Sequence, residues 1–298
     1  CFGSEIGMGE RFDRVVVIGY GKATGNILKY IEEQRAAYGY RLEFIEHENN
    51  AFSITKSICE EADLPYAFMP DKHELSAYLC GIAEKTLIVS ASNNFLFPAA
   101  CVEKNNITII NFHNALLPDY PGRNAPSWVI YQGEQRTGIT WHYVTAGIDE
   151  GNIIMQKECA IGPDDKAYEL TERLMDLACE GFVECFAAVL EERAQTKSQG
   201  AISGRRMYRS YEVPGDGFFD CSEEPERIYR LLRSVDYGKN DIFPHMQTIV
   251  DSRRVEIIRY RKIVPEKRKD EENVMYLPLG AEHLLKIKYK EGCTEAAK

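Results

Sequence analysis

One apolar run, Ile107–Ile110, ends directly on two polar side chains, Asn111 and His113. Such a run is typical of a buried strand in a parallel sheet, which delivers polar groups to the carboxyl edge. Side chains two apart in an extended segment point the same way, so Asn111 and His113 are expected to face one reacting atom. A second strand-like run, 137–144, leads into the turn AGIDEG, which presents Asp149.

These three side chains together suit acyl-type transfer. The amide of Asn111 can donate to an oxyanion, the imidazole of His113 can carry a proton, and the carboxylate of Asp149 favours the protonated imidazole. Taken singly, each residue type is more often a turn former or a helix cap. The chemistry is therefore a hypothesis that depends on the motifs around these residues.

The first half of the chain alternates strand-like and helix-like segments. Strands are expected within 12–20, at 42–45 and at 86–90, and helices at 53–63 and 73–85. This alternation predicts a doubly wound, mostly parallel, Rossmann-like sheet.

Glycines at 19, 21 and 25 follow the first strand, but their spacing is one residue longer than the dinucleotide fingerprint, and no clear acidic residue ends the second strand. We therefore expect a phosphate of a substrate near Gly21 rather than a nicotinamide.

The second half is expected to hold a long packing helix beginning at Asp164 or Asp165, and another after Ser222. Strands are expected at 248–250, 255–263 and 284–289.

Composition limits the class of protein. The chain has 298 residues, 44% of them hydrophobic and 28% charged, as in a globular protein. We expect a cytoplasmic protein with no membrane partner, because no apolar run approaches the length of a membrane span. The nine cysteines are scattered without a CxxC pair, which favours free thiols. The net charge of −10 argues against broad nucleic-acid binding.

The motifs NFHNALLPDYPGRNAPSW and GITWHYVTAGIDEGNII resemble the signature of the folate-dependent formyltransferases. That family comprises methionyl-tRNA formyltransferase, glycinamide ribonucleotide formyltransferase and the nucleotide-sugar N-formyltransferases. The resemblance implies a formyl transferase domain at 12–200 and an OB-like, barrel-like accessory domain at 218–298. Residues 201–217 between them are expected to be a linker, because this part of the chain is rich in Gly, Ser and charged residues. It also implies transfer of a formyl group from 10-formyltetrahydrofolate to a primary amine, without a metal.

The resemblance also implies roles for individual residues. The catalytic residues would be Asn111, His113 and Asp149. The cofactor-binding residues would be Phe95, Leu96, Phe97, Leu117, Pro118, Gly147 and Ile148. The substrate-binding residues would be Gly21, Arg123 and His142.

The acceptor is the least determined part of the function. His142 in the run ITWHY and the segment 120–128, YPGRNAPSW, resemble family members that formylate small amines, among them nucleotide-linked amino sugars. An excess of Arg and Lys in the C-terminal half keeps tRNA open as an alternative acceptor. A hydrolase of 10-formyltetrahydrofolate and a non-catalytic binding module are further alternatives, and a homodimer is left open.

Overall fold

The computed structural model describes residues 11–48, 53–200 and 206–291, which divide into two compact units. The first unit contains the residues up to Gly122, Thr137–Cys159 and Glu172–Met207, and the second contains Arg123–Arg136, Ala160–Thr171 and the residues from Tyr208 onward. The division into a catalytic domain at 12–200, a linker at 201–217 and an accessory domain at 218–298 stays a prediction. Residues 201–205 of that linker lie outside the described residues.

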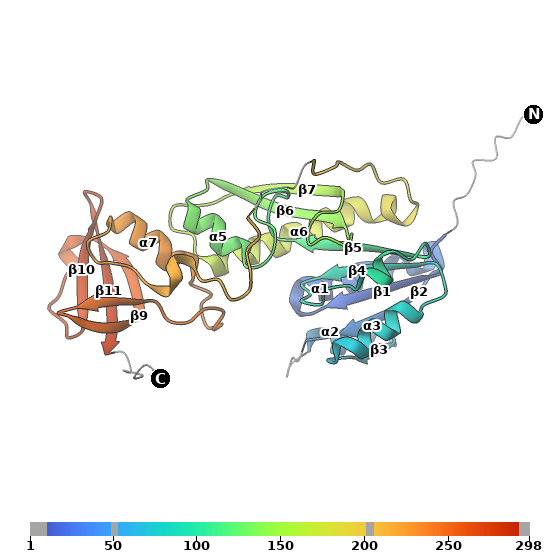
Figure 1. Ribbon diagram of the computed structural model, residues 1–298, viewed down its shortest axis with the longest axis horizontal. Helices are drawn as coiled ribbons and strands as arrows, with labels where there is room; N and C mark the ends of the chain where they lie inside the picture. The colour runs from blue at the N-terminus through green and yellow to red at the C-terminus, as the bar shows by residue number, and fades with distance from the viewer. Residues whose placement is uncertain (1–10, 49–52, 201–205, 292–298) are drawn as a thin grey trace, which may run out of the picture. The chain divides into compact units, whose positions relative to one another are not determined.

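A seven-stranded sheet forms the centre of the first unit, in the order β3-β2-β1-β4-β5-β6-β7 (Figure 1). The strands are β1 (Arg14–Gly19), β2 (Arg41–Glu46), β3 (Tyr66–Phe68), β4 (Thr86–Ala91), β5 (Ile107–His113), β6 (Arg136–Tyr143) and β7 (Ile153–Ala160). Strands β1 to β5 pair in parallel, and β6 runs antiparallel to β5. The expected doubly wound, mostly parallel sheet is confirmed.

The sequences of the central strands explain why they lie inside. All six residues of β4 are buried, as are the last five of β1, because helices cover both faces of a parallel sheet. The helices of this part of the chain are α1 (Gly21–Tyr38), α2 (Ile54–Glu61), α3 (Lys72–Gly81), α4 (Ala99–Val102) and α6 (Ala167–Leu190). Ser53 and Asp71 accept backbone N–H groups at the starts of α2 and α3, which fixes where these helices begin.

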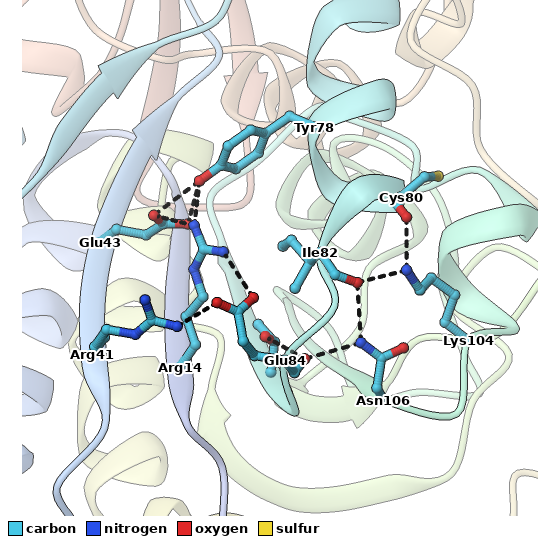
Figure 2. A network of polar contacts seen from close by, with 10 residues as sticks. Arg14, Arg41, Glu43, Tyr78, Cys80, Ile82, Glu84, Lys104 and Asn106 are labelled. Atoms are coloured by element: carbon cyan, nitrogen blue, oxygen red, sulfur yellow. Dashed lines mark hydrogen bonds and ion pairs between the residues drawn. The ribbon is translucent and has the colours of Figure 1, made fainter.

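Helix α3 is shorter than the sequence predicts, because it ends at Gly81 and not at Lys85. After Gly81 the backbone of Ile82 is extended, and the carbonyl groups of this segment are bonded by side chains (Figure 2). Asn106 Nδ2 donates to the carbonyl oxygens of Ile82 and Glu84 at 3.1 and 3.0 Å. These tertiary contacts replace the last helical turn that the sequence predicts.

Figure 2 also shows an ionic network at the amino ends of β1 and β2. Arg14 donates to Glu43 at 2.5 Å and to the hydroxyl of Tyr78, and Arg41 pairs with Glu84. This network joins α3 to the amino ends of the strands, whereas Asn111 lies near the carboxyl end of β5.

The second unit is built around a four-stranded antiparallel sheet, in the order β10-β11-β9-β8. Its elements are α5 (Ala125–Gln132), the 3₁₀ turns η1 (Pro214–Gly217) and η2 (Pro265–Lys267), α7 (Pro225–Ser234), β8 (Gln247–Val250), β9 (Arg253–Ile263), β10 (Val274–Leu279) and β11 (His283–Glu291). Ile228, Leu231 and Leu232 of α7 pack with Leu285 and Ile287 of β11. The expected smaller C-terminal β domain is thus present.

Strands β3 and β10 have no counterpart among the strands expected from the sequence, and both lie at sheet edges. Strand β3 has only three residues, and β10 contains Pro278, which sequence reasoning treats as a strand breaker but which an edge strand tolerates.

Within residues 11–48, 53–200 and 206–291, no helix is long and apolar enough to cross a membrane, and no group of three His, Cys, Asp or Glu side chains could hold a metal ion.

Candidate active site

The pairing of β5 with β6 builds the centre of the site. In this antiparallel ladder Asn111 lies opposite His142, and His113 lies opposite Thr140. The alternate residues Phe112 and Trp141 contact each other, and Trp141 packs against Phe182 of α6 with ring centroids 5.0 Å apart. Because side chains alternate across a strand, the apolar face points to α6 and the polar face points away from it.

Two hydrogen bonds fix the amide of Asn111. The hydroxyl of Ser90, at the end of β4, donates to Asn111 Oδ1 at 2.8 Å, and Asn111 Nδ2 lies 3.2 Å from His142 Nε2. The amide therefore has one orientation, with its oxygen towards β4 and its nitrogen towards β6. Among the described residues, the second N–H of this amide has no acceptor, which leaves it available for a ligand.

His142 acts as the acceptor in its contact with Asn111. Its Nδ1–H donates to the carbonyl oxygen of Tyr143 at 2.9 Å, so the neutral ring presents a lone pair at Nε2. The side chain is only 2% exposed. Burial lowers the pKa of His142, and the nearby carboxylate of Asp149 opposes this effect without cancelling it. The imidazole is therefore neutral at neutral pH.

The carboxylate of Asp149 lies between two imidazoles. Its Oδ2 is 3.5 Å from His113 Nδ1, and its Oδ1 is 3.6 Å from His142 Nε2. The backbone N–H of Gly122 donates to Oδ2 at 2.8 Å, and His113 Nε2 donates to the carbonyl oxygen of Tyr120 at 2.8 Å. The three predicted catalytic side chains thus lie in one cluster, and His142 joins them.

This geometry suits attack on a carbonyl carbon. The open N–H of Asn111 can stabilise an oxyanion, and the pair of His113 and Asp149 can accept a proton from a nucleophile. The cluster is mostly enclosed, since the side chains of His113 and Asp149 are 5% and 10% exposed. Electrostatic interactions are stronger in such surroundings than in water.

Comparison with known proteins identifies the scaffold. Residues 46–186 match the family model described as formyl transferase. This segment, which contains Asn111, His113, His142 and Asp149, is thus similar to the formyl transferase family.

The methionyl-tRNA formyltransferase of Geobacter metallireducens is 30% identical to the chain over 181 residues, 60% of this chain. The matched region spans 57% of that protein's length, so the chain aligns with less than two thirds of it. A second methionyl-tRNA formyltransferase, from Alkaliphilus oremlandii, is 40% identical over 94 residues, 32% of this chain and 30% of that protein.

Solved structures share the fold at lower identity. The N-formyltransferase from Helicobacter canadensis, in complex with folinic acid and dTDP-3-aminofucose, superposes with a TM-score of 0.69 at 15% identity, covering 93% of this chain and 99% of that one. A likely sugar N-formyltransferase from Mycobacterium tuberculosis gives a TM-score of 0.62 at 20% identity, covering 80% of this chain and 93% of that one.

The segment 95–97, to which the family resemblance gives a cofactor role, holds residues of different exposure. Phe95 is 7% exposed, belongs to the core and contacts the rings of His47 and Phe97 edge-on. Leu96 is 70% exposed. Of these three side chains, Leu96 offers the largest apolar surface to a ligand.

The predicted cofactor residues in the turn after β5 and in the Asp149 loop also differ in exposure. Leu117 is 2% exposed, its N–H donates to Thr140 Oγ1, and its carbonyl oxygen accepts from Gln156, so it shapes the turn from inside. Pro118, which follows through a cis peptide bond, is half-buried. Beside Asp149, Gly147 is half-buried and Ile148 is 39% exposed. The cofactor role of these residues stays a prediction.

The predicted substrate residues lie in different settings. Gly21 begins α1 with a φ of 81°, and a Cβ there would meet no atom within 4 Å, so the space in front of it is open. Arg123 is exposed and belongs to the second unit. His142 is buried against Asn111 and Asp149, which is the position of a residue that supports catalytic groups.

Sequence reasoning missed two residues that touch this cluster. Ser90 follows directly on the apolar residues 87–89 of β4, the same signal that marked Asn111 in β5. Gln199 contacts the Asp149 loop from a distant segment rich in glycine and serine, where no sequence pattern marks it.

Proposed function

We propose that the chain transfers a formyl group from 10-formyltetrahydrofolate to the primary amine of a small molecule, a nucleotide-linked amino sugar being the acceptor class. The observation that carries the proposal is the fixed amide of Asn111, with one open N–H beside the buried pair of His113 and Asp149. In a formyl transferase scaffold, this arrangement matches the needs of acyl transfer to an amine.

The proposed reaction assigns one task to each side chain. The amine nitrogen attacks the formyl carbon, and the carbonyl oxygen takes up negative charge that the open N–H of Asn111 stabilises. The pair of His113 and Asp149 accepts the proton that the amine loses and returns it to the folate nitrogen as the bond from carbon to that nitrogen breaks. His142 keeps the amide in place by accepting its other N–H.

The co-substrate is proposed from its chemistry and from the similar structures. The bound molecule in the Helicobacter canadensis complex is folinic acid, and a similar sugar 3N-formyl transferase contains 5-N-formyl-THF. In this chain the exposed apolar side chains of Leu96 and Ile148 suit a flat heteroaromatic ring. Saturating folinic acid should raise the melting temperature, and no change would count against the co-substrate.

Support for an amino-sugar acceptor comes from three directions. Several similar structures are sugar N-formyltransferases. Gly21 opens a helix beside free space, where backbone N–H groups can receive a phosphate. The net charge of −10 disfavours a large polyanion.

One surface favours tRNA as a second candidate acceptor. Arg259 of β9 lies opposite Lys288 of β11, and Arg261 lies opposite Lys286. Of these, Lys286 is paired with Glu271. Like charges directly opposite in a sheet are unfavourable, so an anionic partner would relieve the repulsion. The two curated relatives described above are methionyl-tRNA formyltransferases.

A panel of acceptors tests the proposal. The protein is incubated with 10-formyltetrahydrofolate alone, with nucleotide-linked amino sugars, and with charged initiator tRNA, and formylated product is measured. We expect product with an amino sugar. Formate release without an acceptor would indicate a hydrolase, and no turnover with any acceptor would indicate a binding module.

The salt dependence separates the two acceptors. Three results together would establish the tRNA function. The first is formylated tRNA, and the second is an affinity for tRNA that falls with salt by a log-log slope near −0.9 per phosphate contact. The third is loss of activity in the double variant Arg259→Glu, Arg261→Glu. Unchanged sugar formylation in that variant would support the small-molecule function.

A further inference from the structure

Gln199 reaches the Asp149 loop from the segment that follows α6. The backbones of Ile153 and Lys197 exchange two hydrogen bonds of 2.8 and 2.9 Å, and this bridge brings Gln199 to the loop. Gln199 Nε2 then donates to the carbonyl oxygens of Asp149 and Gly151, at 2.8 and 2.7 Å. Gln199 is 8% exposed, so the contact is shielded from water.

The two carbonyl groups belong to a tight part of the backbone. Asp149 has a φ of 54°, a left-handed conformation that is uncommon for residues other than glycine. A Cβ on Gly151 would lie 1.7 Å from the carbonyl oxygen of Tyr143, so the loop also lies close against the end of β6. A single amide group that bonds both carbonyls holds this turn in its uncommon shape.

We propose that Gln199 is a positioning residue for the reaction, because it fixes the backbone that places the Asp149 carboxylate between His113 and His142. The inference rests on the proposed formyl transfer and adds a residue outside the sequence motifs. The distances from Asp149 to the two rings, 3.5 and 3.6 Å, leave little room for displacement. A shift of about 1 Å in a catalytic group can reduce a rate by about 100-fold.

Two variants and a matched control test this role. Gln199→Ala removes both donors, and we expect kcat to fall by about 10- to 100-fold with a much smaller change in KM. The control is Asn106→Ala, since Asn106 makes the same bidentate contact with two carbonyl groups, those of Ile82 and Glu84, at the opposite edge of the sheet (Figure 2). Its kcat should remain at the wild-type value.

Gln199→Glu adds a readout that a merely structural role would not move. The ionised carboxylate repels both carbonyl oxygens, whereas the protonated acid can still donate one O–H. Burial favours the protonated form, so the activity of this variant relative to wild type should rise as the pH falls from about 7.5 to about 5.5. A ratio that stays constant with pH, or a Gln199→Ala variant with unchanged kcat, would overturn the inference.

Hydrogen exchange separates this inference from the proposed function. Backbone amides of residues 145–151 should exchange faster in Gln199→Ala than in wild type and Asn106→Ala, whatever the reaction is. If the wild-type protein shows no formyl transfer, the proposed function is refuted. Active wild type with unchanged exchange in Gln199→Ala would refute the positioning role alone.

Discussion

Replacing Asn111 with alanine tests the oxyanion role directly, because the structure gives this amide one orientation and one open N–H. Removing one oxyanion donor typically reduces kcat by about 100- to 1,000-fold, which corresponds to about 3 to 4 kcal/mol of transition-state stabilisation. We expect a loss of this size in Asn111→Ala, with KM changed far less, because the donor acts on charge that develops only in the transition state.

The same substitution also affects folding. It removes the contacts of Asn111 with Ser90 and His142, and leaves the buried Nε2 of His142 without its donor, which costs about 1 to 3 kcal/mol of the free energy of unfolding. A domain with a typical stability of about 5 to 15 kcal/mol remains folded after such a loss. Circular dichroism and the thermal shift with folinic acid verify that the variant is folded and still binds.

The assay is steady-state formylation of the preferred amine under saturating 10-formyltetrahydrofolate. Asn106→Ala serves as the control, because it removes two hydrogen bonds beside the amino end of the same strand, and should lower stability without lowering kcat. A fall in kcat of less than about tenfold, or 1.4 kcal/mol, in a folded Asn111→Ala variant would refute the assignment of Asn111 as the oxyanion donor.

Two further predictions concern the charges around this amide. Asp149→Asn should keep the fold, because the amide oxygen can still accept from the N–H of Gly122. Its kcat should fall by at least about tenfold, while KM changes little. Unchanged turnover would remove Asp149 from the mechanism. His142 has a pKa lowered by burial, so the unfolded state binds its proton first as the pH falls below about 6.5, and the folded state loses stability there. Chemical unfolding at about pH 7.5 and about pH 5.5 should therefore show that the free energy of unfolding falls less with acid in His142→Gln than in wild type. The difference is at most about 1.4 kcal/mol per pH unit. An equal fall in both proteins would contradict a neutral buried imidazole.

The sequence by itself determined the fold class and the three predicted catalytic side chains. Continuous apolar runs such as that of β4 identify strands buried on both faces, because this signal depends only on neighbouring residues. Asn111 and His113 stood out for the same reason: they follow directly on an apolar run. The sequence motifs around these two residues then indicated the family.

Only the tertiary structure decided how these residues meet. The antiparallel register of β5 and β6 places His142 opposite Asn111, so that this predicted substrate residue is a buried acceptor for the Asn111 amide. The bridge between Ile153 and Lys197 brings Gln199 to the Asp149 loop across some 50 residues of chain. Strand register and long-range bridges depend on the packing of the whole sheet, whereas the patterns visible in a sequence report the surroundings of a few neighbouring residues.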